Sequence, residues 1–141
     1  MQLKDILATK GTDVLSIEPS ATMADAVDKM VAHRCGSLVV CEGDSMVGII
    51  SERDVLRAIS GASESLDKIS VAARMTKEVI TGTPDQNIND TMGLMTKNHV
   101  RHLPVLHNGK LAGLISIGDV VKAEYQKLAM ENHLLMSYIQ S

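Results

Sequence analysis

The amino-acid sequence contains one motif twice, and this duplication constrains the fold more than any other feature. The segment Gly48–Asp54 has the pattern Gly-x-x-Ser-x-x-Asp, and the pattern returns 65 positions later in Gly113–Asp119. The same spacing pairs residues outside the motif: Pro19 with Pro84, Asp25 with Asp90, Met30 with Met95, Leu38 with Leu103 and Val40 with Val105. A repeat of this kind predicts two similar folding units. Copies of about 60 residues are marginal alone, so we expect them to pack together.

Apolar periodicity and turn residues predict the same order of elements in both copies. The predicted helices are 1–8, 22–33, 51–60, 70–75, 87–98 and 119–139, and the predicted strands are 14–17, 36–41, 46–50, 79–81, 102–106 and 110–115. Asn108-Gly109 is a strong hairpin signal, and 61–65 is a small-residue linker. We therefore expect an α+β fold of two helix-strand-strand-helix repeats with small three-stranded sheets, over 8–62 and 74–130, followed by a long C-terminal helix over 119–140.

The serine and aspartate of each motif are predicted to lie where a strand ends and a helix begins. The free N–H groups and positive dipole end of such a junction suit phosphate. A short carboxylate beside a cleft can also accept two hydrogen bonds from a diol, as on a ribose. The alternative is a capping box, in which both side chains only satisfy helix N–H groups. The motif glycine favours a ligand site, because glycine weakens a strand unless something approaches its backbone closely.

Composition argues against several classes of function. The net charge of the 141 residues is −3 and the 14 basic residues are scattered, so nucleic acid is not an expected partner. No apolar run approaches membrane length and the first residues lack a secretory signal, which predicts no membrane association and a cytoplasmic location. Cys35 and Cys41 match no metal or redox spacing and are expected to be reduced, mostly buried thiols. The only aromatic residues are Tyr125 and Tyr138, so a purine would lie between aliphatic side chains.

Taken together, the doubled motif after a hairpin, the proline before each first helix and the His-Leu-Pro-Val strand of copy two resemble a tandem pair of CBS domains. Such a pair is often called a Bateman module, and the chain is similar to a module that stands alone without an attached enzyme. The resemblance covers Thr12 to about Lys122. It implies two repeats around a pseudo-twofold axis, two related clefts and an adenosine ligand such as AMP, ADP, ATP or NAD(H), with S-adenosylmethionine less expected. Similar modules pair into disc-shaped dimers, so the resemblance also implies a homodimer.

Carried over residue by residue, the resemblance makes Asp54 and Asp119 the carboxylates that bind ribose. Each cleft is expected to draw on both repeats. The cleft of Asp119 is expected to contain Thr12, Asp13, Val14, Cys35, Gly36, Arg101, His102, Ser116 and Gly118. The cleft of Asp54 is expected to contain Ser51, Arg53, Val79 and Ile80.

The two clefts are expected to differ in charge. Copy two has Arg101-His102 where copy one has Gly36-Ser37, at a strand start that faces the nucleotide phosphate in similar modules. An arginine fork and an imidazolium suit phosphate. The alternatives are a solvated loop charge for Arg101 and a neutral strand-edge side chain for His102. Copy one has Arg53 within its motif, which would either reach a second phosphate or lie exposed on a first helical turn.

No nucleophile with a positioned base, carboxylate pair or metal-ligand set is visible, so no catalytic or metal residue is assigned and an enzyme is not expected. The favoured interpretation is a regulatory module that senses adenine nucleotides and signals to a partner protein of unknown identity. The alternative is a structural dimerisation module with one or both clefts inactive. Retention of the motif glycine, serine and aspartate in both copies favours the first.

The C-terminal helix carries apolar residues at alternating spacings of four and three, which is typical of a heptad seam. The seam consists of Val121, Tyr125, Leu128, Asn132, Leu135 and Ile139. Leu134 and Met136 broaden its apolar face, which is also compatible with a helix packed on its own module. We expect this tail to contribute to the subunit interface of a homodimer.

Overall fold

The computed structural model describes residues 1–61 and 64–140, so the predicted linker 61–65 lies partly outside the described residues. The chain divides into two compact units. Unit 1 consists of Met1–Thr12, Thr81–His107 and Ala112–Ser141, and unit 2 consists of Asp13–Ile80 and Asn108–Leu111. Each unit therefore combines most of one copy of the repeat with the short helix that precedes the other copy in the sequence.

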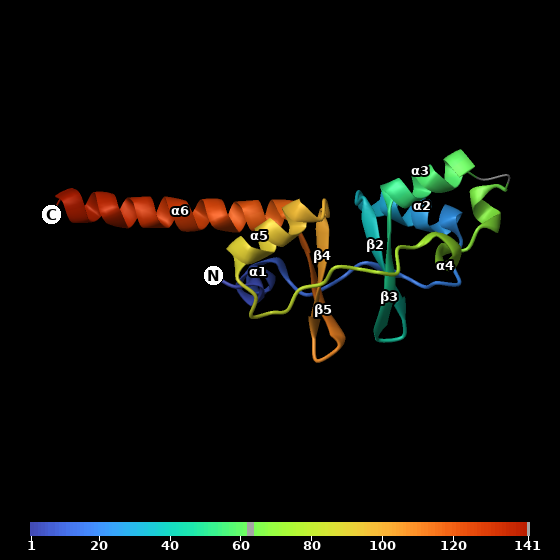
Figure 1. Ribbon diagram of the computed structural model, residues 1–141, viewed down its shortest axis with the longest axis horizontal. Helices are drawn as coiled ribbons and strands as arrows, with labels where there is room; N and C mark the ends of the chain where they lie inside the picture. The colour runs from blue at the N-terminus through green and yellow to red at the C-terminus, as the bar shows by residue number, and fades with distance from the viewer. Residues whose placement is uncertain (62–63, 141) are drawn as a thin grey trace. The chain divides into compact units, whose positions relative to one another are not determined.

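Unit 2 is built on a three-stranded sheet with the order β1-β2-β3. Strand β1 (Ser16–Ile17) is parallel to β2 (Ser37–Glu42), which is antiparallel to β3 (Ser45–Ser51). Helix α2 (Met23–His33) contacts β2, and α3 (Glu52–Gly61) contacts β3 (Figure 1). The 3₁₀ helix η1 (Leu66–Lys68) packs on α2, and α4 (Val71–Arg74) packs on α3. The core contains Ile17, Met23, Ala26, Met30, Leu38, Val40, Ile50, Ala58, Ile69 and Val71.

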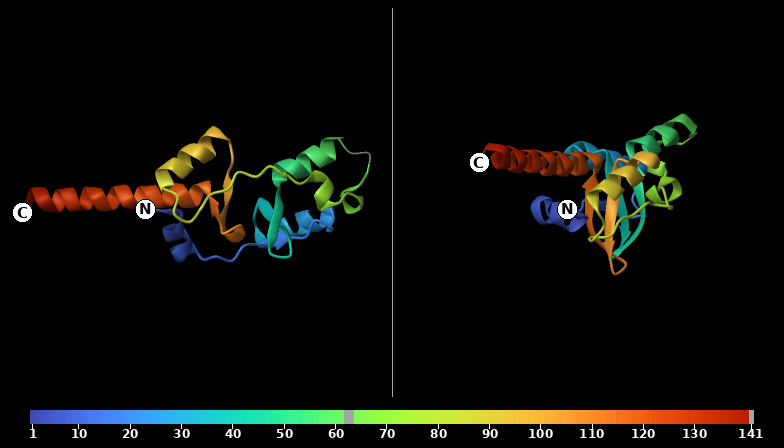
Figure 2. Two further views of the ribbon diagram at one scale, coloured as in Figure 1. Left: turned by 60° about the horizontal axis from the view of Figure 1, so that its bottom comes forward. Right: turned by 60° about the vertical axis from the view of Figure 1, so that its left-hand side comes forward.

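Unit 1 contains β4 (His102–His107) and β5 (Lys110–Ser116) except for the first two residues of β5, and the two strands pair as a hairpin. Helix α6 (Ile117–Gln140) starts directly after β5 and contacts both α5 (Ile88–Lys97) and α1 (Leu3–Lys10). Only the start of α6 is buried, through Val120 and Ala123. The rest of this helix continues past α1 and α5 (Figures 1 and 2), and residues 128–140 are all exposed. The buried residues of the unit include Leu3, Ile6, Leu7, Ile88, Met95, Leu103, Val105 and Ile115.

Most predicted elements are confirmed within one or two residues. The hairpin at Asn108-Gly109 is confirmed by φ angles of 53° and 78°, the two left-handed residues that a type I′ turn requires. Helix α2 begins at the capping box that its sequence indicates, with Thr22 as N-cap and Asp25 as the reciprocal partner. None of the helices in the described part of the chain is long and apolar enough to cross a membrane.

The predicted strand 79–81 is wrong, so the sheet of unit 1 has two strands rather than three. In its place, Gly82 forms a single parallel bridge to Val105. The Gly82 N–H donates to the Pro104 carbonyl and the Gly82 carbonyl accepts from the Leu106 N–H, both at 2.9 Å. Pro84 has no N–H and cannot extend the ladder. The counterpart β1 is also shorter than the predicted 14–17, and η1 was not expected from the sequence.

Candidate functional site

The second copy of the motif forms the junction between β5 and α6. The Ser116 N–H donates to Asp119 Oδ2 at 2.8 Å, and the Asp119 N–H donates to Ser116 Oγ at 3.1 Å. This reciprocal pair is a capping box, so the structural role considered for these two residues is present. It fixes the Asp119 carboxylate at the first turn of α6, while 26% of its side chain stays exposed to solvent.

The Asp119 carboxylate is held by the side chain of Lys10, a residue from which the sequence predicted only a backbone contribution to this cleft. Lys10 Nζ lies 2.5 Å from Asp119 Oδ2 and donates a second hydrogen bond to the Leu114 carbonyl at 2.8 Å. Partial burial raises the pKa of the Asp119 carboxyl, but hydrogen bonds from Lys10 and Ser116 outweigh it and leave that pKa below its ordinary value. Lys10 is 109 positions from Asp119 in the chain. The contact follows from the placement of α1 in unit 1, which no local pattern indicates.

The first copy of the motif has the same capping geometry but a different third partner. The Ser51 N–H and Ser51 Oγ both donate to Asp54 Oδ2, at 2.9 and 3.0 Å, and the Asp54 N–H lies 3.4 Å from Ser51 Oγ. Asp54 Oδ1 accepts a hydrogen bond from the hydroxyl of Thr76 at 3.3 Å. Asp54 is only 6% exposed, whereas Asp119 is half-buried. The two carboxylates therefore differ in both burial and partner.

The motif glycines make room for this chain's own atoms. A Cβ at Gly48 would lie 2.7 Å from the Thr76 carbonyl oxygen, and a Cβ at Gly113 would lie 2.5 Å from Leu7 Cδ2. The Thr76 backbone also pairs with Ile49 in both directions, at 2.8 and 3.0 Å. The close approach expected at each glycine thus exists, but packing of the segments around Thr76 and Leu7 explains it without a ligand.

The strand starts that precede the motifs differ as the sequence indicates. Arg101 is exposed, its carbonyl accepts from the Ile117 N–H at 2.8 Å, and His102 is half-buried. In copy one the Gly36 carbonyl accepts from the Glu52 N–H at 3.0 Å, and the Glu52 side chain lies against Gly36. Ser37 is 5% exposed and its Oγ has no hydrogen-bond partner among the described residues. A cation therefore stands beside one motif and a buried neutral hydroxyl beside the other.

The remaining predicted site residues divide between the units. Unit 1 holds Thr12, Arg101, His102, Ser116, Gly118 and Asp119, and unit 2 holds Asp13, Val14, Cys35, Gly36, Ser51, Arg53, Asp54, Val79 and Ile80. The whole set predicted for the Asp54 cleft thus lies in unit 2. The set predicted for the Asp119 cleft comes from both units, and its assembly into one site stays a prediction. Arg53 is exposed, and Cys35 and Cys41 are free, half-buried thiols, less buried than expected.

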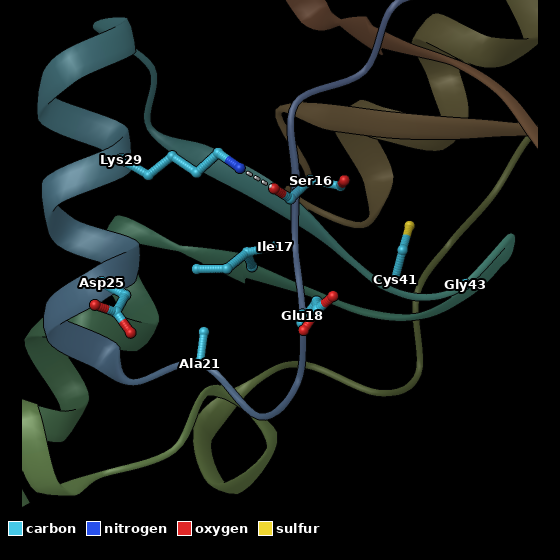
Figure 3. Close-up of a pocket in the computed structure, with 8 residues that line it drawn as sticks. All are labelled: Ser16, Ile17, Glu18, Ala21, Asp25, Lys29, Cys41 and Gly43. Carbon is cyan, nitrogen blue, oxygen red and sulfur yellow. Dashed lines mark hydrogen bonds between the residues drawn. The ribbon is translucent and has the colours of Figure 1, made fainter.

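A separate cavity of about 530 Å³ lies in unit 2, between α2 and the β2–β3 turn (Figure 3). Lys29 reaches from α2 to the Ser16 carbonyl, and Cys41 and Gly43 lie at the opposite wall. None of the residues predicted for a ligand site lines this cavity. Within residues 1–61 and 64–140, no group of three histidine, cysteine or acidic side chains is placed to hold a metal ion.

Comparison with known proteins assigns the family. The model of the CBS domain matches residues 3–61 and 69–125, so it accounts for most of the chain as two repeats. The "CBS domain-containing protein CBSX3, mitochondrial" of Arabidopsis thaliana is 37% identical over 98% of this chain and 71% of its own length. A crystal structure of a CBS-domain protein of Agrobacterium tumefaciens is 38% identical, covers 88% of this chain and 99% of its own, and superposes with a TM-score of 0.83.

A CBS domain protein of Pyrobaculum aerophilum, solved in complex with AMP, is 24% identical and has a TM-score of 0.74, covering 84% of this chain and 89% of its own. At that identity the likeness concerns the fold alone. The match of the family model to both copies and the coverage of the Arabidopsis and Agrobacterium relatives agree on one assignment. The chain belongs to the CBS-domain family and carries two CBS repeats.

Proposed function

We propose that this protein is a regulatory module that binds an adenine nucleotide and passes the bound state to a partner protein, without catalysing a reaction itself. The observation that carries the proposal is the duplicated junction at which a serine and an ionisable aspartate lie together at a helix start. The CBS-domain structure from Pyrobaculum aerophilum that contains AMP supports an adenosine ligand for this fold. A cytoplasmic location stays a prediction from the N-terminal residues.

In this proposal the Asp119 site is the main nucleotide site. Its carboxylate is partly exposed and ionised, so it can accept hydrogen bonds from a ribose diol. Arg101 is exposed at the start of β4, and its carbonyl accepts a hydrogen bond from the N–H of Ile117, the residue after the motif serine. Its guanidinium suits a phosphate. AMP, ADP, ATP and NAD(H) all contain a ribose diol and a phosphate.

The test is the loss of nucleotide affinity in the Asp119→Ala variant. A hydrogen bond to a charged group is worth about 1.5 to 3 kcal/mol, so the variant is expected to bind AMP, ATP or NAD roughly ten- to a hundredfold more weakly. Isothermal titration calorimetry measures this directly. Asp90→Ala is the matched control, because Asp90 is an exposed carboxylate on α5 of the same unit. Equal affinity of the wild type and Asp119→Ala would reduce Asp119 to its capping role.

A structural dimerisation module is the second candidate, and the capping boxes favour it. Both motifs satisfy their own serine and aspartate without a ligand, and both motif glycines are explained by internal packing. Such a module would show no saturable heat with any adenine nucleotide at either site. It would still be dimeric in solution.

A further inference from the structure

The two motif aspartates are held by chemically different side chains. Asp54 accepts from the neutral hydroxyl of Thr76, whereas Asp119 accepts from the ammonium of Lys10. Lys10 is the last residue of α1, which packs on α6, and Thr76 follows α4, which packs on α3. In each unit the segment that precedes the other repeat thus supplies the donor. The chemical difference between these donors distinguishes the two sites.

One oxygen of the Asp119 carboxylate, Oδ2, has little capacity left to accept further hydrogen bonds. Each carboxylate oxygen has about two lone-pair directions. On Asp119 Oδ2 these are used by the Ser116 N–H at 2.8 Å and by Lys10 Nζ at 2.5 Å. The Ser116 N–H is fixed by the helix start. A diol that binds both carboxylate oxygens must therefore displace the Lys10 ammonium from Oδ2.

Lys10 can leave Asp119 without losing all of its partners. Its ammonium also donates to the Leu114 carbonyl at 2.8 Å, and its side chain is 40% exposed, so water can replace the carboxylate. The ion pair is consequently weak enough for a ligand to break, as is usual for pairs near the surface. Thr76 on Asp54 is a neutral partner at the longer distance of 3.3 Å, so competition by an ammonium is specific to the Asp119 site.

We propose that Lys10 is a specificity-determining residue that competes with the ligand's vicinal diol for the Asp119 carboxylate. The proposal rests on the proposed nucleotide site at Asp119. Removing the ammonium strengthens the contact between the diol and the Asp119 carboxylate. The contacts of the protein with the base and the phosphate do not involve this carboxylate, so they are not changed by the competition. Ligands that lack the diol gain nothing from its removal, because they do not need Oδ2.

The experiment compares AMP with 2′-deoxyAMP in the wild type and in Lys10→Met, by isothermal titration calorimetry. The preference for AMP over 2′-deoxyAMP, taken as the ratio of their Kd values, is expected to rise roughly three- to fivefold in Lys10→Met. Loss of a positive charge changes the affinity of both nucleotides alike, so the ratio removes that general effect. Methionine keeps the apolar stem of the lysine and therefore most of its packing.

Lys4→Met is the matched control, because it removes the same charge from an exposed position of α1 and is expected to leave the ratio unchanged. An unchanged or smaller ratio in Lys10→Met, with the wild type binding AMP and Asp119→Ala losing it, overturns the competition and leaves the proposed function intact. Absence of AMP binding to the wild type and to Lys10→Met overturns both. A rise in the ratio in Lys4→Met equal to that in Lys10→Met also overturns the competition.

Discussion

The Lys10–Asp119 ion pair makes a testable contribution to stability at the scale of single residues. Because the pKa of Asp119 is lowered in the folded protein, its carboxylate stabilises the fold fully above the ordinary value of 3.8 and progressively less as pH falls through the lowered pKa. Lys10→Met should reduce the free energy of unfolding by about 0.5 kcal/mol at pH 7, since both side chains are partly exposed. Urea unfolding of both proteins from pH 7 to pH 3 measures this difference.

The difference between wild type and Lys10→Met is expected to shrink toward zero on acidification. Hydrogen bonds lower the pKa values of Asp25 and Asp85 as well, but these groups are present in both proteins and cancel in the comparison. A difference that stays constant from pH 7 to pH 3 would assign the effect of the substitution to packing of the lysine stem rather than to the ion pair.

Arg101 provides a second prediction at this scale, about the charge of the ligand. If its guanidinium binds phosphate, Arg101→Ala should weaken AMP binding about tenfold or more, because a charge-assisted contact is lost, and should leave adenosine binding unchanged. Titration of each variant with both ligands gives the comparison. Lys97→Ala removes an exposed cation of the same unit and serves as the control. Unchanged AMP affinity would return Arg101 to a solvated loop charge, and parallel losses of AMP and adenosine affinity would contradict a contact specific to the phosphate.

At the scale of elements, the motif glycine Gly48 and the helical glycine Gly93 should respond to alanine in opposite directions. At Gly48 an alanine Cβ would meet the Thr76 carbonyl oxygen at 2.7 Å and Met75 Sδ at 2.8 Å, and the backbone atom cannot move without breaking the Ile49–Thr76 pairing. Gly48→Ala should therefore lower the free energy of unfolding by about 1 to 3 kcal/mol. Gly93 lies inside α5 with open space at its Cβ position, so Gly93→Ala should raise that energy by about 0.5 to 1 kcal/mol.

Thermal or urea unfolding of the wild type and the two glycine variants measures whether each substitution lowers or raises the free energy of unfolding. Tolerance of Gly48→Ala would mean that the close approach at β3 is not a constraint on the fold, and destabilisation by Gly93→Ala would mean that its position in α5 has no room for a Cβ. The pairing also positions Thr76, whose hydroxyl donates to Asp54.

The elements that the sequence predicts well are those whose signal is local. The β2–β3 and β4–β5 hairpins, the cap at Thr22 and the strand-to-helix junctions all follow from residues within a few positions of one another. The strand expected at 79–81 failed because only one bridge, at Gly82, forms there. The left-handed residues Arg34 and His99, with φ of 53° and 54°, close α2 and α5 at equivalent places, yet neither is a glycine or asparagine that would announce such a turn.

The candidate site also shows that only local features could be predicted from the sequence. The serine and aspartate of each motif were expected at the strand-to-helix junction, and the capping box that they form was the alternative weighed against a ligand site. The contacts of Lys10 and Thr76 with these aspartates were not predicted, because each donor comes from a segment that precedes the other repeat in the sequence. The exchange of short helices between the repeats is a property of the tertiary structure, and a periodic pattern along the chain carries no information about it.

At the scale of the whole molecule, the C-terminal helix carries apolar side chains that its own unit leaves exposed to solvent. Tyr125, Leu128, Leu135 and Ile139 of the predicted seam are 72, 54, 62 and 74% exposed. The alternative of a helix packed along its length on its own module is thereby excluded for residues 128–140, which are all exposed. An apolar face of this kind favours association with another chain, and the alternating spacing of four and three residues is that of helices packed in a coiled coil. We therefore keep the expectation of a homodimer in which the tail takes part.

Truncation after Lys127 is the sharpest test of that dimer, since it keeps the buried Ala123 and removes most of the seam. The wild type should have the mass of a dimer by light scattering and the truncated chain that of a monomer. Leu128→Asp should weaken the dimer in the full chain, because it places a charge in the seam. Met130→Asp is the matched control: it is similarly exposed, at 67%, but lies two positions further along the helix, roughly 200° around its axis. A truncated chain that remains a dimer would place the subunit interface on the repeats, and equal effects of the two aspartates would mean that the heptad spacing does not define the contact.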